Sequence, residues 1–213
     1  MIIMLSGKRQ SGKTTLARML EKEYGYHVVG LADPLYDIYN MVANSLPSNP
    51  WLTAALAALS GTYTYPQLGP YHGELPEAQR RVLIQLGAYI REHFGTNTLC
   101  WETQRRISKL PLNAKYRGMS GKDIAVHNVV IHNFRFPDEA KFFASDNQHV
   151  TTVRLERVGY ERPDDGVSTD ASETALDNYA FDLRFEVPDG DMEAMRRVAK
   201  TLAGLPHRGQ ARF

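Results

Sequence analysis

Apolar runs of strand length alternate with amphipathic stretches along most of the chain. A run such as MIIMLS at residues 1–6 is apolar at nearly every position, which predicts a strand buried on both faces of a sheet. The amphipathic stretches repeat apolar residues three and four positions apart, as surface helices do. Strands are predicted at 1–6, 26–32, 128–132, 151–156 and 183–187, and helices at 12–24, 33–44, 76–94, 98–109, 137–144 and 191–203. This alternation predicts an α/β fold with a mostly parallel sheet of about five strands and helices on both faces.

Three segments interrupt the alternation. Residues 111–126 are polar and contain glycine, and we predict a mobile loop there. Residues 158–172 are also polar and too long for a simple connection. Residues 35–110 carry several helices between two predicted strands. We therefore expect a single domain over residues 1–213, with a helical insertion at about 35–110 and a lid-like loop at about 158–172.

Composition and charge narrow the class of protein. The 213 residues are 43% hydrophobic and 23% charged, which is typical of a globular domain. The net charge of +1 gives no electrostatic reason to expect a nucleic-acid or membrane partner. The one cysteine, Cys100, excludes an intrachain disulfide and a cysteine-based zinc cluster, and it fits a reducing compartment. We expect a soluble protein of the cytoplasm.

A glycine-rich motif follows the first predicted strand. The stretch GKRQSGKT at residues 7–14 matches G-x-x-x-x-G-K-[ST] between an apolar strand and a helix. The glycines let successive N–H groups point inward, and the helix N-terminus adds positive potential. Lys13 is placed to reach the β- and γ-phosphates, and Thr14 to ligate Mg²⁺. The motif predicts a nucleoside triphosphate and Mg²⁺ as ligands and fits kinases, GTPases and motor ATPases alike. The expected contacts come from Gly7, Lys8, Arg9, Gln10, Ser11, Gly12, Lys13, Thr14 and Thr15.

Several segments together resemble one family of P-loop enzymes. In chain order they are LSGKRQSGKTT, LADPLYDI, LIQLGAYIREHFGTNTLCWE, VVIHNFRFPDEA, VRLER and TDASE. They resemble the deoxynucleoside monophosphate kinases of tailed bacteriophages, a branch of the P-loop NMP kinase superfamily. The resemblance implies a three-layer P-loop kinase fold, phosphoryl transfer from ATP to a deoxynucleoside 5′-monophosphate, and, for a phage protein, the host cytoplasm. Animal-type phosphomevalonate kinases share parts of the pattern.

The resemblance implies acceptor-binding residues in the helical insertion. It makes Arg91 a contact of the acceptor's α-phosphate and Gln85 a contact of its base, although Arg91 also fits a solvated position on an amphipathic helix. Trp101 either stacks on the base or packs in the core. Asp33 follows the second predicted strand, at the sheet edge where ligands bind in open α/β folds. There it caps the next helix, holds Mg²⁺ through water, or orients the acceptor phosphate.

The stretch NFRF after the strand at 128–132 departs from the family at one position. The family has Asp where this chain has Asn133, and an amide cannot neutralise the charge of a metal ion. The predicted metal ligands are therefore Thr14 and Asp33, with the neighbouring Asp138 or Glu139 as a further candidate. Arg135 ends the strand segment, where its guanidinium can clamp a phosphate bidentately. Glu139, in the first turn of the next helix, is expected to pair with Arg135.

Two further arginines are candidates for the lid. NMP kinases carry arginines on a mobile lid that neutralise the transition state and exclude water. Arg157 and Arg162 are predicted to act in this way, and the alternative is a solvated loop. The resemblance also makes Glu173 part of an acidic substrate-binding segment, although this stretch is equally a helix start. The predicted catalytic set is Lys13, Arg135, Arg157 and Asp33.

Two other classes of function stay open. One is a kinase for a different small phosphate, such as phosphomevalonate. The other is a nucleotide-binding regulatory protein without turnover, for which Asn133 is the best support. The expected partners are small-molecule nucleotides, and a homodimer is compatible with the sequence.

Overall fold

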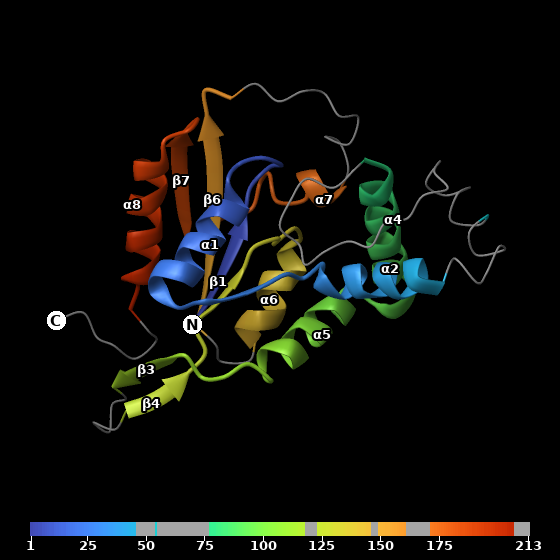
Figure 1. The fold of residues 1–213 in the computed structure, drawn as a ribbon, viewed down its shortest axis with the longest axis horizontal. Coiled ribbons are helices and arrows are strands. Elements are labelled where there is room, and N and C mark those ends of the chain that lie inside the picture. Colours follow the sequence, from blue (N-terminus) through green and yellow to red (C-terminus); the bar gives the residue numbers. More distant parts are fainter. Residues whose placement is uncertain (46–53, 55–76, 118–122, 146–148, 161–170, 207–213) are drawn as a thin grey trace. The chain divides into compact units, whose positions relative to one another are not determined.

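The chain divides into two units. The structure is a computed structural model, and it describes residues 1–45, 54, 77–117, 123–145, 149–160 and 171–206 (Figure 1). Unit 1 comprises Met1–Leu31 and Gln104–Phe213, and unit 2 comprises Ala32–Thr103. Unit 1 contains the sheet and the glycine-rich loop. Unit 2 contains most of the predicted helical insertion.

β1 (Ile2–Ser6) is the central strand of unit 1. It pairs in parallel with β5 (Val129–Ile131) on one side and with β6 (Val150–Val158) on the other. β2 (His27–Val29) pairs with β5, and β7 (Leu183–Pro188) pairs with β6, so the strand order is β2-β5-β1-β6-β7. All residues of β1 are buried because the strand lies between two neighbours and between two helix layers. The predicted α/β fold with a parallel five-stranded sheet is confirmed.

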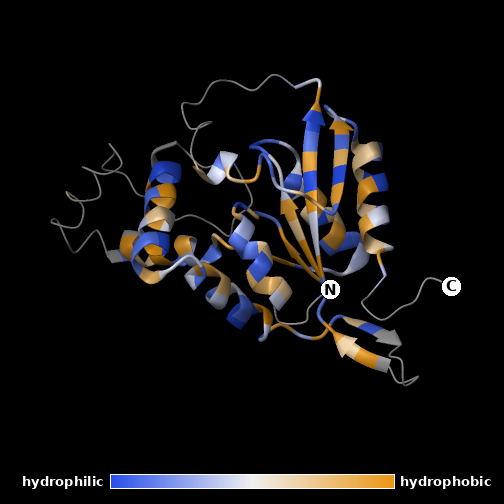
Figure 2. Cartoon of the chain, turned by 180° about the vertical axis from the view of Figure 1, so that it is seen from behind, coloured by the Kyte–Doolittle hydropathy of each residue, from blue (hydrophilic) through white to orange (hydrophobic). Residues whose placement is uncertain are grey.

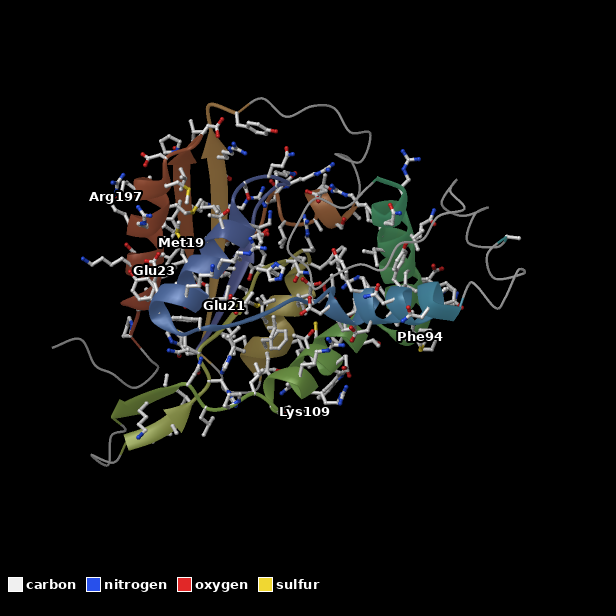
Figure 3. The ribbon with its side chains drawn as sticks, in the orientation of Figure 1. Met19, Glu21, Glu23, Phe94, Lys109 and Arg197 are labelled. Atoms are coloured by element: carbon white, nitrogen blue, oxygen red, sulfur yellow. The ribbon has the colours of Figure 1, made fainter. Side chains whose placement is uncertain are left out.

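Helices cover both faces of this sheet. α1 (Lys13–Tyr24) and α8 (Met192–Ala203) contact each other and share one core with the odd-numbered residues of β1. Met19 of α1 belongs to this core and lies between α1 and α8 in Figure 3. In the strand order β2-β5-β1-β6-β7, α1 connects β1 to β2 and so runs toward the β2 edge of the sheet. α6 (Pro137–Ser145) connects β5 to β6 and so runs toward the β7 edge. Right-handed crossovers in opposite directions place their helices on opposite faces.

The periodic apolar residues fill the core of unit 1. Leu16 and Leu20 lie one turn apart on α1, and both are fully buried, as is Leu202 of α8. Burial of one such leucine side chain stabilises the fold by about 1.5–3 kcal/mol. The edge strand β7 leaves every second residue exposed, and Figure 2 shows hydrophobic and hydrophilic residues alternating along it.

The prediction of a loop over residues 111–126 is wrong. β3 (Ala114–Arg117) and β4 (Asp123–Val126) pair there in an antiparallel two-stranded sheet. The apolar run of this ribbon, residues 124–126, is only three residues long, and Ile124 is exposed. It therefore lacks the longer apolar signal by which the core strand at 1–6 is predicted. The side chain of Asn113 donates hydrogen bonds to the carbonyl oxygens of Gly25 (2.7 Å) and Asn128 (3.0 Å), which joins the start of the ribbon to the rest of unit 1.

Unit 2 is helical. Its elements are α2 (Asp33–Ser45), α4 (Glu77–Phe94) and the first part of α5 (Thr98–Ile107). α2 and α4 pack through a buried cluster of Leu35, Tyr36, Tyr39, Val82, Leu83 and Ile90. Neither α4, with 18 residues, nor any other helix in the described part of the chain is both long and apolar enough to cross a membrane.

Candidate phosphate-binding site

A tight loop of residues 7–12 connects β1 to α1. Gly7 (φ 155°) and Gly12 (φ 92°) both have positive φ, which glycine adopts without steric cost. The loop also passes close to its surroundings, because a Cβ on Gly7 would lie 2.3 Å from the carbonyl oxygen of Leu155. α1 begins at Lys13 without a side-chain cap and with no acidic residue in its first turn. The loop therefore leads into a helix N-terminus that favours an anion.

The side chain of Lys13 lies folded into this loop. Lys13 is buried, and its Nζ donates hydrogen bonds to the carbonyl oxygens of Gly7 and Lys8, both at 2.7 Å. A third hydrogen bond goes to Oγ of Ser11 at 3.2 Å. An ammonium group that is buried among carbonyl dipoles provides a fixed positive charge beside the loop N–H groups. Nζ of Lys13 can donate to phosphate oxygens in place of these neutral acceptors, because hydrogen bonds between charged groups are stronger.

The other residues of the motif flank Lys13. Arg9, Thr14 and Thr15 are half-buried, and the two threonines lie in the first turn of α1. The hydroxyl of Thr14 is the kind of hard oxygen ligand that Mg²⁺ accepts, usually together with phosphate oxygens and water.

Arg135 is held by two acidic residues in different ways. Glu139 Oε2 accepts hydrogen bonds from the backbone N–H groups of Arg135 (2.8 Å) and Phe136 (3.0 Å), so it caps the start of α6. The guanidinium of Arg135 forms an ion pair with Glu173 at 2.8 Å and donates to the carbonyl oxygen of Ser172 at 3.3 Å. Glu173 is buried in α7 (Ala171–Thr174). The expected contact between Arg135 and Glu139 therefore involves the main chain, and the ion pair joins Arg135 to Glu173.

Lys8 contacts the same acidic segment. Its Nζ lies 2.6 Å from Oδ1 of Asp177 and donates to the carbonyl oxygen of Glu173, also at 2.6 Å. Asp177 also pairs with the buried Arg154, whose Nη1 donates to the hydroxyl of Ser6 at 3.4 Å. The hydrogen bond from Lys8 is the main cause that lowers the pKa of Asp177 below its ordinary value, and Arg154 adds to it. Asp177 thus carries a negative charge beside the glycine-rich loop of residues 7–12.

Arg157 lies on the other side of the loop, near the end of β6. Its Nε donates to Oδ1 of Asp189 at 2.7 Å, and Nη1 donates to the carbonyl oxygen of Gln10 at 3.1 Å. The guanidinium also stacks over the ring of Tyr160, 4.0 Å from the centroid. Arg157 therefore touches the phosphate loop itself, at its main chain.

Asn133 joins two strand ends. Its Oδ1 accepts a hydrogen bond from the backbone N–H of Leu31 at 2.7 Å, and the next residue, Phe134, donates its N–H to the carbonyl oxygen of Leu5 at 3.1 Å. The segment after β5 thus continues beside the end of β1. In this position the side chain of Asn133 has a structural task that needs an acceptor oxygen but no charge.

The remaining predicted site residues lie in unit 2 or outside the described residues. Asp33 is the first residue of α2 and is half-buried, rather than standing before the helix as a cap. Gln85 is exposed on α4, and Arg91 donates from Nη1 to the carbonyl oxygen of Thr96 at 3.3 Å. Trp101 is 64% exposed, so the alternative in which it packs in the core is wrong. Arg162 and most of the lid-like loop at 158–172 lie outside the described residues.

Unit 1 thus brings together residues far apart in the sequence. Lys13 and Arg157 bond to carbonyl oxygens of the loop. Lys8, which belongs to the loop, and Arg135 both contact Glu173. The acidic partners Asp177 and Asp189 and the aromatic Tyr160 were missed by sequence reasoning, because single acidic residues and tyrosines in polar stretches carry no distinctive spacing. The order of the two predicted strands gives a partial signal for Asp189. When parallel strands such as β6 and β7 pair, the residues at and after their ends come together, here Arg157 and Asp189.

Two solved structures align with this chain over most of its length. A shikimate kinase from Aquifex aeolicus is 16% identical, with 96% of this chain and 97% of that chain covered and a TM-score of 0.42. A shikimate kinase from Bacteroides thetaiotaomicron is 13% identical, with 95% and 96% covered and a TM-score of 0.35. At these TM-scores neither likeness bears on what this chain binds. No protein-family model and no curated protein sequence matches the chain.

Proposed function

We propose that the chain binds ATP through the loop between β1 and α1 and transfers its γ-phosphoryl group to a deoxynucleoside 5′-monophosphate. The observation that carries this proposal is the position of Lys13. Its buried Nζ is bonded to Gly7, Lys8 and Ser11 within a loop that leads into an uncapped helix. Backbone N–H groups, a helix N-terminus and one fixed ammonium form the combination that binds polyphosphates.

Phosphoryl transfer mainly requires that charge be neutralised and that the donor and acceptor oxygens be aligned. Lys13 supplies positive charge at the donor phosphates. Thr14 is the residue in unit 1 that would hold Mg²⁺, which contributes charge neutralisation between the phosphates. An acceptor phosphate is already ionised, so the reaction needs no general base.

Arg135 is the residue of unit 1 best suited to hold a second phosphate. Its backbone is fixed by Glu139, and its guanidinium is held by Glu173 next to the loop segment that contains Lys8. The ion pair with Glu173 and the hydrogen bond to Ser172 both use Nη1, so they orient the planar group before a ligand arrives. The other N–H donors of the guanidinium can then bind a phosphate while the ion pair with Glu173 is kept, which supports the role of Arg135 as a phosphate clamp.

The deoxynucleoside monophosphate as acceptor rests on the sequence resemblance and on unit 2. Gln85 and the indole of Trp101 are exposed there, and an exposed amide and an exposed aromatic ring suit a nucleobase. Arg91 adds a guanidinium that suits a phosphate. Asp33 completes the proposed acceptor and metal residues of this unit.

A second candidate is a nucleotide-binding protein without turnover. Asn133 favours it, because this residue replaces the usual acid of the family and its amide oxygen is bonded to the backbone of Leu31. Such a protein would bind ATP through the same loop but transfer no phosphate.

The test is an acceptor panel. The protein is mixed with ATP, Mg²⁺ and each deoxynucleoside monophosphate, with phosphomevalonate in a parallel reaction, and ADP is measured by a coupled assay. We expect ADP that depends on one or more deoxynucleotides. Lys13→Ala is expected to lower kcat/KM on the order of 100-fold or more, because it removes a charge that is bound more tightly in the transition state.

The matched control is Lys200→Ala, which removes an exposed lysine from α8. It is expected to leave kcat/KM unchanged. ADP formation with phosphomevalonate alone would move the proposal to that substrate class. ATP binding without acceptor-dependent ADP would favour the second candidate, and full activity of Lys13→Ala would refute the assignment of the loop.

A further inference from the structure

Gln10 has an unusual backbone conformation within the phosphate loop. Among the described residues it is the one residue other than glycine with a positive φ, 62°. The left-handed region is sterically unfavourable for a residue with a Cβ, so a non-glycine residue persists there when its surroundings hold it. The conformation of Gln10 therefore needs a structural cause.

This conformation matters for anion binding. Left-handed residues such as Gln10 and Gly12 turn the peptide planes of the loop so that neighbouring N–H groups face one concavity. The turn is closed by a hydrogen bond from the N–H of Ser11 to the carbonyl oxygen of Lys8 at 3.2 Å. If Gln10 relaxed to a right-handed conformation, the peptide between Gln10 and Ser11 would rotate, and the hydrogen bond that closes the turn would be lost.

Two side chains at the end of β6 hold Gln10, one within the strand and one just after it. The hydroxyl of Tyr160 donates to Oε1 of Gln10 at 2.6 Å, and Nη1 of Arg157 donates to the carbonyl oxygen of Gln10 at 3.1 Å. One contact fixes the side chain of Gln10 and the other fixes its peptide plane. Together the two contacts hold both the side-chain amide and the backbone carbonyl group of Gln10.

Arg157 is itself anchored to the edge of the sheet. Its guanidinium lies over the ring of Tyr160 and bonds to Asp189, which follows β7. Val158 and Pro188 pair at the ends of β6 and β7, and the N–H of Asp189 donates to the carbonyl oxygen of Val158 at 2.9 Å. The group that holds Gln10 is therefore built on paired strands and not on the loop alone.

We infer that Arg157 and Tyr160 are positioning residues that hold Gln10 in its left-handed conformation and so preorganise the loop for a polyphosphate. The inference rests on the proposed binding of a triphosphate by this loop. It gives Arg157 a role through the loop backbone, which differs from direct contact with the transferring phosphate. It also predicts that a glycine at position 10 makes the two residues largely dispensable, because glycine reaches positive φ without support.

The experiment measures binding of two probes by isothermal titration calorimetry. The probes are Mg²⁺-ATP and inorganic tripolyphosphate, which has the phosphates but no base. Tyr160→Phe removes the hydroxyl contact and keeps the ring, and Arg157→Lys keeps the charge and removes the planar fork. Each is expected to weaken both probes by a similar factor of about three to ten, the effect of losing one or two hydrogen bonds. In the Gln10→Gly background each is expected to change the affinity less than twofold.

The controls are Tyr24→Phe and Arg196→Lys, which alter exposed residues of α1 and α8. Both are expected to bind as the wild type does. A loss confined to ATP, with tripolyphosphate unchanged, would overturn the inference by placing Arg157 and Tyr160 at the base. An equal loss with and without Gln10→Gly would also overturn it. Wild-type protein that binds neither probe refutes the proposed function, whereas wild-type binding with unchanged variants refutes this inference alone.

Discussion

Removing Arg135 is expected to destabilise the protein more than neutralising its partner Glu173. The two side chains lie 2.8 Å apart, and Arg135 is 26% exposed whereas Glu173 is 6% exposed. Arg135→Met leaves a buried carboxylate without its guanidinium, and breaking a buried pair in this way costs about 3–5 kcal/mol. Glu173→Gln leaves a guanidinium that water can still reach, so we expect a loss of about 1–2 kcal/mol in the free energy of unfolding.

Urea unfolding followed by circular dichroism measures these free energies. The double variant Arg135→Met with Glu173→Gln has no buried charge at this place, so it is expected to be more stable than Arg135→Met alone by about 1–2 kcal/mol. The pair Glu193 and Arg196 on α8 serves as the control, because both side chains are more than half exposed. Removing either one is expected to cost less than about 0.5 kcal/mol. Equal losses for Arg135→Met and Glu173→Gln, or a double variant no better than Arg135→Met, would refute the reasoning.

Two further predictions concern buried positions. Burial raises the pKa of Tyr26 from 10.0 to about 12, so the folded protein favours the neutral phenol more than the unfolded chain does. The resulting contribution to the free energy of unfolding is full below pH 10 and is lost as the pH rises toward 12. At pH 11 the free energy of unfolding, measured with urea, is expected to be lower by about 1.4 kcal/mol. Tyr26→Phe should not show this loss, whereas the control Tyr24→Phe, at an exposed position, should show it as the wild type does. The same loss in Tyr26→Phe as in the wild type would contradict the prediction. A Cβ at Gly7 would lie 2.3 Å from a carbonyl oxygen, so Gly7→Ala is expected to weaken ATP binding at least about tenfold in calorimetry. Gly25 also has positive φ, but a Cβ there would have open space around it, so the control Gly25→Ala should bind ATP with wild-type affinity. Equal affinities of the wild type, Gly7→Ala and Gly25→Ala would contradict the prediction.

The elements of the sheet could be predicted because each one carries its own local signal. β1 and β5 are short apolar runs, and α1 begins at the glycine-rich motif and ends at Gly25, which adopts the left-handed conformation typical of a helix C-terminus. The ribbon of β3 and β4 could not be predicted in this way, because it lies outside the core and needs no apolar face.

The contacts around the phosphate loop could be predicted only in part. The motif predicts that Lys13 lies at the loop between the first strand and the first helix, and the structure has it there, because the strand, the turn and the helix are contiguous in the sequence. Which acidic side chain forms an ion pair with which basic side chain depends on how segments far apart in the sequence pack together. Arg135 meets Glu173 rather than the nearer side chain of Glu139, which is used by the backbone at the start of α6. Local spacing contains no information about such a choice.

The central place of β1 has a consequence for the order of folding. Among the five strands of the sheet, β1 comes first in chain order, but both of its neighbours, β5 and β6, follow from Val129 onward. Parallel pairings between such distant segments form slowly, and on the ribosome they cannot form until most of the chain has emerged. A fragment that ends before β6 would contain the complete glycine-rich motif but neither Arg157 nor the strand that supports it. Nucleotide binding by this loop would therefore report that unit 1 has finished folding, and a fluorescent ATP analogue could follow that last step directly.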